Sequence, residues 1–177
     1  MGSMTERVAL YGPDGRPTGE VATRAEMRAR NLWHGATAVV VRDPAGRVYV
    51  HRRTDTKDVY PGRYDFAAGG VLQAGEEPHA AALREVEEEL GVTGVALRPL
   101  FETDYADDQT RFHAHCYECT WDGPIRWQPE EVAWGEWVTP DRLLAMIGEL
   151  PFMPDTVANL RPWLDDLRRS WTDRAGG

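Results

Sequence analysis

The stretch that decides the fold is GVLQAGEEPHAAALREVEEELGV, residues 70–92. It predicts a helix over residues 78–90, because Pro78 suits the first helical turn and Gly91 suits a left-handed C-terminal cap. Two glutamates just before Pro78 complement the positive end of the helix dipole. The stretch is therefore a loop, a capped helix and a second loop.

Three glutamates of this helix fall on one face. At about 100° per residue, Glu85, Glu88 and Glu89 point the same way, whereas Glu87 points away from them. Like charges at these spacings cost roughly a few tenths of a kcal/mol per pair, so local stability does not favour them. A divalent cation reverses the argument, because clustered carboxylates supply the oxygen ligands that Mg²⁺ prefers. A solvated acidic face is the alternative that the helix alone leaves open.

Strands and helices alternate on both sides of this stretch. The pattern predicts strands over 36–41, 48–53, 64–68, 95–105, 111–121 and 133–138, and helices over 24–30, from 140, and over 155–171 with an interruption at Pro162. The first two strands form a β-hairpin, because a turn sequence joins them. This order predicts an α/β (α+β) fold in which helices pack on a mixed β-sheet.

The length of 177 residues predicts a single domain, which we place at residues 5–177. Residues 1–4 are expected to be a cloning remnant without fixed structure. The chain has no apolar run long enough for a membrane span, and no secretion signal is expected at its start.

Net charge and cysteine content limit the expected binding partners and the expected cellular location. Lys and Arg total 20 against 29 Asp and Glu, and this net charge of -9 argues against nucleic-acid or membrane binding. Two cysteines are too few for a disulfide framework. We therefore expect a cytoplasmic protein.

The spacing within residues 70–92 resembles the complete signature of the Nudix hydrolase family. The matching positions are Gly70, Glu76, Arg84, Glu85, Val86, Glu88, Glu89, Gly91 and Val92. The resemblance implies an α/β/α sandwich and a loop-helix-loop that binds Mg²⁺ or Mn²⁺. It also implies hydrolysis of a phosphoanhydride bond in a nucleoside diphosphate linked to another moiety, or in a related organic diphosphate.

The resemblance also implies roles for single residues. Glu85, Glu88 and Glu89, with the backbone of Gly69, would hold the metal, and Glu76 would be an auxiliary acid. Arg84 would orient the carboxylates through charge-assisted hydrogen bonds. The general base stays open: it is Glu85, Glu88 or a glutamate of a later loop, with Glu130, Glu131 and Glu136 as the candidates.

The stretch from His51 to Glu77, together with residues 33–41, resembles the isopentenyl diphosphate isomerase-like branch of this family. Isomerases of that branch place a catalytic cysteine followed by Gly-His just before the signature, where this chain has Gly69, Gly70 and Val71. The missing thiol and imidazole favour hydrolysis over isomerisation. A sensor that binds a nucleotide-like ligand without cutting it is a further alternative, against which the intact glutamates speak.

Positive charge gathers just before the signature in His51, Arg52, Arg53, Lys57 and Arg63. Arginine suits bidentate recognition of phosphate, so we predict that Arg52, Arg53 and Lys57, with the backbone of Gly70, bind the diphosphate of a small-molecule substrate. Solvated strand and loop ends are the alternative reading. A homodimer is expected by similarity alone.

We expect structural roles for the remaining cysteines and histidines discussed next. Cys116 and Cys119 should lie on opposite faces of one strand, a poor geometry for a shared metal. His113 and His115 share a face, yet partly exposed strand positions explain them more readily than function does. His34 is expected to make a structural hydrogen bond.

Overall fold

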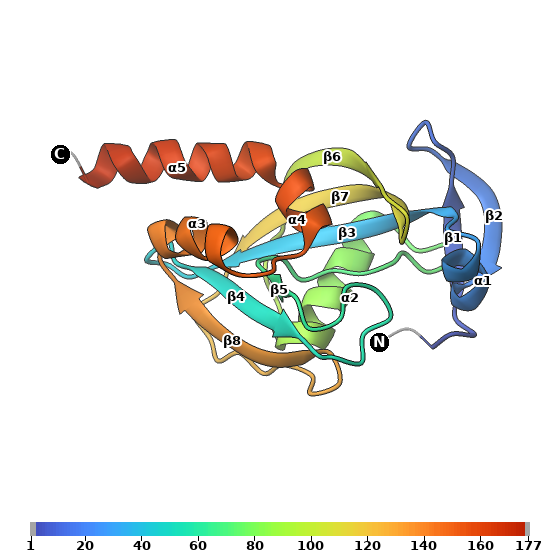
Figure 1. Cartoon of the computed structure of the whole chain (residues 1–177), viewed down its shortest axis with the longest axis horizontal. Helices are drawn as coiled ribbons and strands as arrows, with labels where there is room; N and C mark the ends of the chain where they lie inside the picture. The colour runs from blue at the N-terminus through green and yellow to red at the C-terminus, as the bar shows by residue number, and fades with distance from the viewer. Residues whose placement is uncertain (1–2, 176–177) are drawn as a thin grey trace.

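A computed structural model describes residues 3–175. Its strands are β1 (Arg7–Tyr11), β2 (Pro17–Thr23), β3 (Trp33–Arg42), β4 (Val48–Arg53), β5 (Tyr64–Asp65), β6 (Arg98–Ala106), β7 (Arg111–Thr120) and β8 (Val132–Val138). Its helices are α1 (Arg24–Ala29), α2 (Pro78–Leu90), α3 (Pro140–Glu149), α4 (Pro154–Asn159) and α5 (Arg161–Ala175). The element labels appear in Figure 1.

Strand β3 runs through the middle of the sheet. It pairs in parallel with β7 along its whole length, from Trp33 opposite Arg111 to Arg42 opposite Thr120. Its pairings with β1 and β4 are antiparallel, as are those of β4 with β8 and of β6 with β7. The sheet is therefore mixed, as the alternation of strands and helices predicted (Figure 1).

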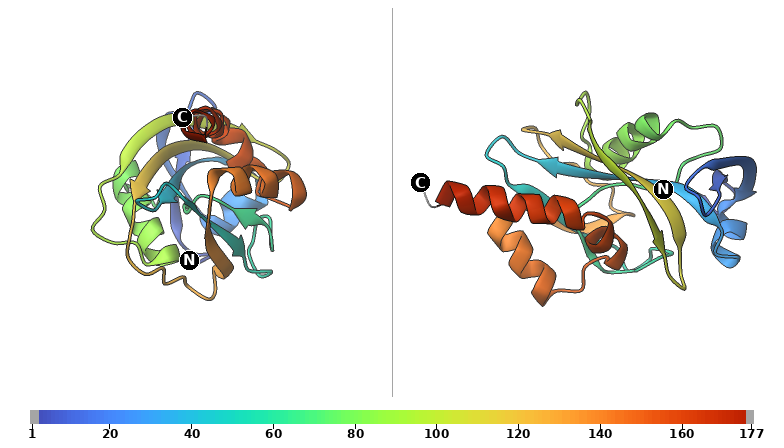
Figure 2. Two further views of the ribbon diagram at one scale, coloured as in Figure 1. Left: turned by 90° about the vertical axis from the view of Figure 1, so that its left-hand side faces the viewer. Right: turned by 90° about the horizontal axis from the view of Figure 1, so that it is seen from above.

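Both faces of β3 are covered. Val40 belongs to one apolar cluster, which includes Leu143 of α3 and Leu164 of α5. Val39 belongs to a second cluster, which includes Val86 of α2. Side chains alternate across a strand, so α2 packs on one face of the sheet and the C-terminal helices on the other (Figure 2). The predicted arrangement of helices on both sides of a mixed sheet is confirmed.

The N-terminal hairpin of β1 and β2 was not predicted. Hairpin residues 17–21 are all exposed, so they lack the apolar alternation that marks a strand. The hairpin is attached through β1, where Val8 packs with Met27 and Val71. The backbone carbonyl of Met4 accepts a hydrogen bond from the N–H of Ala25 at 3.0 Å, so Met4 is part of this arrangement. Residues 1–2 of the expected cloning remnant lie outside the described residues.

Two predicted elements differ from the structure in more than the position of their ends. The strand expected at 64–68 pairs with β4 over Tyr64 and Asp65 only, because the chain then crosses to β3, where Ala68 bridges Val39. The last helical segment breaks at Leu160 and not at Pro162. Pro162 instead occupies the first turn of α5, where its missing N–H costs no hydrogen bond.

Cys116 and Cys119 are free and buried, and they lie in the two opposite clusters, as the strand periodicity predicted. Among residues 3–175, no helix has the length and apolar character needed to cross a membrane.

Candidate functional site

Helix α2 presents its glutamates because its other face is fixed in the core. Val86 and Leu90 are buried against the sheet, and Gly91 ends the helix in the left-handed conformation with φ of 70°. The side chain of Glu88 is 40% exposed, whereas those of Glu85 and Glu89 are 13% and 8% exposed. The predicted face therefore runs from solvent at Glu88 into the protein at Glu89.

Arg84 ties the acidic groups together. Its Nε and Nη2 atoms donate to the two carboxylate oxygens of Glu76 at 2.7 and 2.9 Å. Its Nη1 atom donates to Glu85 at 2.7 Å and to Glu88 at 3.3 Å. Such bidentate, charge-assisted bonds fix geometry as well as supply energy. The sequence prediction that Arg84 orients the carboxylates agrees with this geometry.

Gly70 lies directly against the side chain of Glu85. A Cβ atom at Gly70 would lie 2.4 Å from Glu85 Oε1, so the carboxylate rests directly against the backbone. Position 69 requires glycine, because a Cβ there would lie 1.9 Å from the backbone carbonyl oxygen of Thr37 on β3. The two glycines let the chain pass between the central strand and the acidic face of α2.

Burial disfavours the charged forms of the two inner glutamates of α2. Burial, together with Glu85, raises the pKa of Glu89 to about 8. Burial also raises the pKa of Glu85, although Arg84 opposes the rise. At Glu76 the hydrogen bonds from Arg84 and the Gln73 backbone outweigh burial, and the pKa is lowered. Buried carboxylates that repel one another fit a hard divalent cation such as Mg²⁺, which neutralises them and takes oxygen ligands.

Among the three later glutamates, Glu131 is the one that turns inward. Its buried carboxylate forms an ion pair with Lys57, and it is close enough to Glu89 to raise the pKa of that residue further. Glu130 and Glu136 are exposed. The fold thus brings Glu131 and Lys57 to the buried end of the acidic face.

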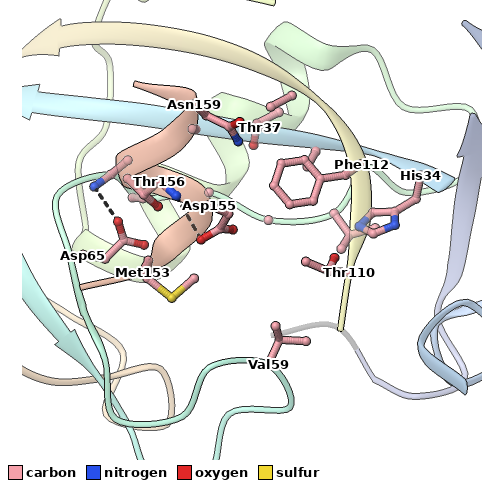
Figure 3. Close-up of a pocket in the computed structure, with 18 of the residues that line it drawn as sticks. His34, Thr37, Val59, Asp65, Thr110, Phe112, Met153, Asp155, Thr156 and Asn159 are labelled. Carbon is pink, nitrogen blue, oxygen red and sulfur yellow. Dashed lines mark hydrogen bonds between the residues drawn. The ribbon is translucent and has the colours of Figure 1, made fainter. Parts of the chain in front are cut away.

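A pocket opens beside Gly69 and Gly70, on the sheet face that carries the C-terminal helices (Figure 3). It holds about 770 Å³ of empty space, its open mouth included. Its floor consists of small side chains, namely Ala36, Ala38, Ala67, Ala68 and Ala114. Val59 and Met153 form apolar walls, while Thr37, Thr156 and Asn159 add polar groups.

Two of the three predicted substrate-binding cations line this pocket. Arg53 and Lys57 do so together with Gly70, whereas Arg52 is directed elsewhere. Arg52 donates to the carbonyl of Gly62 at 3.1 Å and to Asp55 at 2.7 Å, within its own loop. A register shift in the β4–β8 pairing falls between Arg52 and Arg53, and the two side chains diverge there.

Two further cations of the pocket escaped the sequence prediction. Arg24 and Arg28 are one turn apart on α1, and Asp58 holds both, with distances of 3.4 and 3.0 Å to the same oxygen. Burial acts to raise the pKa of Asp58, but the two arginines lower it to about 2. The spacing of these arginines at i and i+4 predicts that they share a helix face. The sequence does not show, however, that α1 lies beside this pocket.

The pocket also holds two unpredicted acids, Asp65 and Asp155. Burial, together with Asp155, raises the pKa of Asp65 to about 7. Burial raises the pKa of Asp155 too. The Asp65 carboxyl accepts backbone hydrogen bonds from Phe66 and Ala67 at 2.8 and 3.2 Å. Near neutral pH the cations of the pocket are therefore only partly offset, and the pocket suits an anion.

His34 lies in the pocket wall and makes the expected structural hydrogen bond. Its Nδ1 lies 3.0 Å from the carbonyl oxygen of Leu32, which fixes Nδ1 as the donor. Burial lowers the pKa of His34 to about 3; the bond to Leu32 opposes this, and Arg28 and Arg24 add to it.

This burial predicts a loss of stability in acid. Below about pH 6.5 the unfolded chain binds a proton at His34 that the folded chain does not, so the free energy of unfolding falls as pH drops toward about 3. The slope from one such residue approaches about 1.4 kcal/mol per pH unit. We expect His34→Asn to flatten this slope in urea titrations between pH 6.5 and 4. The exposed His79 gives the control His79→Asn, and equal slopes in the two variants would contradict the assignment.

Comparisons with known proteins show which family this chain resembles. Residues 32–164 match the NUDIX domain. A Nudix hydrolase of Rhodococcus erythropolis is 43% identical over 167 residues, which cover 88% of this chain and 90% of the relative. The Nudix hydrolase YfcD of Escherichia coli K12 is 41% identical over 143 residues, covering 81% and 78%.

Solved structures share the fold. The crystal structure of DR0079 from Deinococcus radiodurans superposes with a TM-score of 0.71 at 26% identity, over 93% of this chain and 98% of that one. A MutT protein from Methanosarcina mazei gives a TM-score of 0.65 at 18% identity, over 78% and 94%.

Proposed function

Since this chain belongs to the Nudix family and is a hydrolase that acts on pyrophosphate bonds, we propose that it works with Mg²⁺ on a small organic diphosphate. The substrate class is a nucleoside diphosphate linked to another moiety, or a related organic diphosphate. Mn²⁺ is the alternative ion, because it also takes oxygen ligands.

One observation carries this proposal: an acidic helix face and a cation-lined pocket meet at Gly70. The glutamates of α2 suit a cation, while Arg24, Arg28, Arg53 and Lys57 suit an anion. A substrate diphosphate bridging the two would place its phosphoanhydride bond at their junction. Its non-phosphate part would then occupy the pocket between α4 and the sheet.

The residues divide the work by their surroundings. Glu85, Glu88 and Glu89, with the backbone of Gly69, would hold the metal, which when bound supplies positive charge to the phosphate oxygens and lowers the pKa of attacking water. Arg84 holds Glu85 and Glu88 in place through its hydrogen bonds. Arg53 and Lys57 would bind the diphosphate from the pocket side, next to the backbone of Gly70.

The general base stays among Glu85, Glu88 and Glu131. Of the loop glutamates we favour Glu131, because its carboxylate is buried near Glu89 whereas Glu130 and Glu136 are exposed. The ion pair with Lys57 holds the Glu131 carboxylate at the buried end of the acidic face.

The test is a turnover screen with Mg²⁺. Nucleotide sugars, dinucleotides, nucleoside triphosphates and isoprenoid diphosphates are each incubated with the protein, and phosphate, pyrophosphate and the nucleotide products are quantified. We expect cleavage of at least one class, lost when the metal is chelated. Ligand-induced stabilisation without turnover across the panel would instead support a sensor and overturn the proposal.

The isomerase alternative has a separate readout in the same screen. Interconversion of isoprenoid diphosphate isomers without hydrolysis would revive it. The two cysteines of the chain, Cys116 and Cys119, are buried and neither lines the pocket, so no thiol is available there for proton transfer.

Arg84→Lys should lower the rate without unfolding the protein. Lysine keeps the charge but loses the fork that reaches Glu76 and Glu85 together. Loss of such orienting contacts costs roughly 10-fold to 100-fold in metal affinity or activity. We expect kcat to fall within that range and the Mg²⁺ concentration for half-maximal rate to rise. An unchanged Mg²⁺ dependence would show that Arg84 does not position the ligands.

A cytoplasmic location without nucleic-acid or membrane partners, and a homodimer, stay predictions from charge and resemblance. That residues 5–177 form a single domain also stays a prediction.

A further inference from the structure

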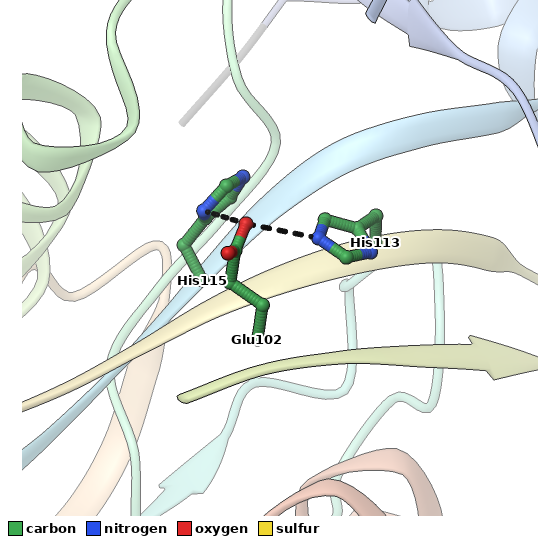
Figure 4. A group of neighbouring side chains, drawn as sticks. All are labelled: Glu102, His113 and His115. Carbon is green, nitrogen blue, oxygen red and sulfur yellow. Dashed lines mark hydrogen bonds and ion pairs between the residues drawn. The ribbon is translucent and has the colours of Figure 1, made fainter. Parts of the chain in front are cut away.

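A cluster of nitrogen and oxygen donors lies on strands β6 and β7, outside the site described above (Figure 4). Glu102 on β6 is paired directly opposite His115 on β7. His113 is two residues away from His115, so both imidazoles project from the same face of the sheet. Adjacent strands therefore hold the three side chains together.

The donor atoms are close to the spacing of a metal site. Glu102 Oε1 is 3.1 Å from His113 Nε2 and 3.0 Å from His115 Nδ1, and all three groups offer donor atoms within 4.8 Å of one another. Ligands bonded at about 2.0 to 2.1 Å in a tetrahedral zinc site are roughly 3.3 Å apart. Two of the three ligand-to-ligand distances are therefore already near those of a tetrahedral site.

The outer nitrogen of each imidazole faces a second partner. His113 Nδ1 lies 2.6 Å from Asp104 Oδ1, and His115 Nε2 lies 3.5 Å from the Tyr11 hydroxyl. The Tyr11 ring also stacks on His113, with centroids 6.0 Å apart and an interplanar angle of 17°. Metal-binding histidines usually donate their other N–H to a carboxylate or similar group, which fixes the ring and the tautomer.

Both ring nitrogens of His113 face carboxylates, so this position favours a positive charge. Since the Asp104 carboxylate accepts, His113 Nδ1 carries the proton, and a neutral ring then turns the lone pair of Nε2 toward the Glu102 carboxylate. Two lone pairs at 3.1 Å repel unless a positive group lies between them. Either a second proton on His113 or a metal ion removes this repulsion.

Exposure allows an ion to enter. The imidazoles of His113 and His115 are 13% and 15% exposed, while the Glu102 side chain is 59% exposed. The rigid ligands are therefore held in the protein and the flexible one faces solvent, where water can complete the coordination.

We propose that Glu102, His113 and His115 bind a divalent transition-metal ion, with Zn²⁺ best matched to the ligands, at a site distinct from the α2 glutamates. Two imidazoles and one carboxylate form the ligand set of a zinc site that keeps an open position. The α2 site offers oxygen ligands alone, which suit Mg²⁺. The ion would fasten β6 to β7 beside the N-terminal hairpin, where Tyr11 and the turn at Gly15 contact His113.

The test measures zinc binding while the α2 site is suppressed. Zn²⁺ is titrated by calorimetry into the full chain carrying Glu88→Gln, in excess Mg²⁺ and above the pKa of both imidazoles, because protons compete for the ligands. We expect one zinc per chain. His115→Ala or Glu102→Gln should weaken binding by at least about 100-fold, and Asp104→Asn by about 10-fold to 100-fold, since it removes an orienting partner.

The matched control is His79→Ala, which removes an exposed histidine from α2. It should leave the zinc affinity unchanged. Diffraction at the zinc absorption edge should place the ion between Glu102, His113 and His115. Equal zinc binding in wild type and in Glu102→Gln, or a zinc peak at the α2 glutamates only, would overturn the proposal. Glu102→Gln is a surface change, so loss of folding does not confuse this result.

Discussion

Replacing Glu88 by glutamine is expected to lower kcat for diphosphate hydrolysis by at least about 100-fold, because a direct metal ligand should cost more than the 10-fold to 100-fold of an outer contact. Glu88 is 40% exposed, so the isosteric amide should leave the fold intact. The amide cannot supply the negative charge that balances a divalent cation. Initial rates over a range of Mg²⁺ concentrations, with circular dichroism as a check of folding, measure the effect.

The control for this change is Glu87→Gln, one residue earlier on the same helix. Glu87 is exposed and points away from the acidic face. Both variants lose one negative charge from α2, but only the Glu88 variant loses a proposed metal ligand. The Glu87 variant should therefore retain the wild-type rate. Equal rates for the Glu87 and Glu88 variants would show that total charge, and not ligation, governs activity. Wild-type activity in Glu88→Gln would remove the basis of the assignment.

Gly69→Ala is expected to lower the free energy of unfolding by about 3 kcal/mol or more, the upper part of the range for overpacked sites. The added Cβ would lie 1.9 Å from the Thr37 carbonyl oxygen and 3.1 Å from Ala38 Cα. Both are backbone atoms of β3, which is bound to β7 along its length and cannot move aside easily. Urea unfolding followed by circular dichroism measures the change.

Gly148→Ala is the control for this prediction: it is the same substitution, but it should not lower the free energy of unfolding. Gly148 is an exposed residue of α3, and a Cβ there meets nothing within 4 Å. Alanine in a helix is favoured over glycine by up to about 1 kcal/mol, so this variant should be as stable as wild type or more so. A Gly69→Ala protein that unfolds at the wild-type urea concentration would mean that the crossing at Thr37 is looser than described.

The bounds of α2 and the common face of its glutamates were predictable because their determinants are local. The spacing of Glu85, Glu88 and Glu89 fixes their common face, and Pro78 and Gly91 mark the ends of the helix. The central strands were equally readable, since buried valines of β3 alternate between two clusters. The family assignment and the mixed sheet between helices are confirmed, while the isomerase-like branch stays a prediction.

The pocket was not predictable, because its residues come from distant parts of the chain. Arg24 and Arg28 lie on α1 and Asp155 and Asn159 on α4, and periodicity alone does not say where these short helices dock. The same limit applies to Glu131, which sequence could not separate from Glu130. The difference between them lies in which one faces Lys57, and that is set by the pairing of β8 with β4.

The alanine floor of the pocket has a consequence for how such an enzyme could change its preference. Ala36, Ala38 and Ala114 project from β3 and β7, whereas the glutamates stand on α2 across the sheet. A larger apolar residue at one of these positions would shorten the space for the leaving moiety and leave the reacting groups in place. Under the proposed function, selectivity for the size of the substrate and cleavage of its bond would be set by different segments, so that either could be redesigned while the other is kept.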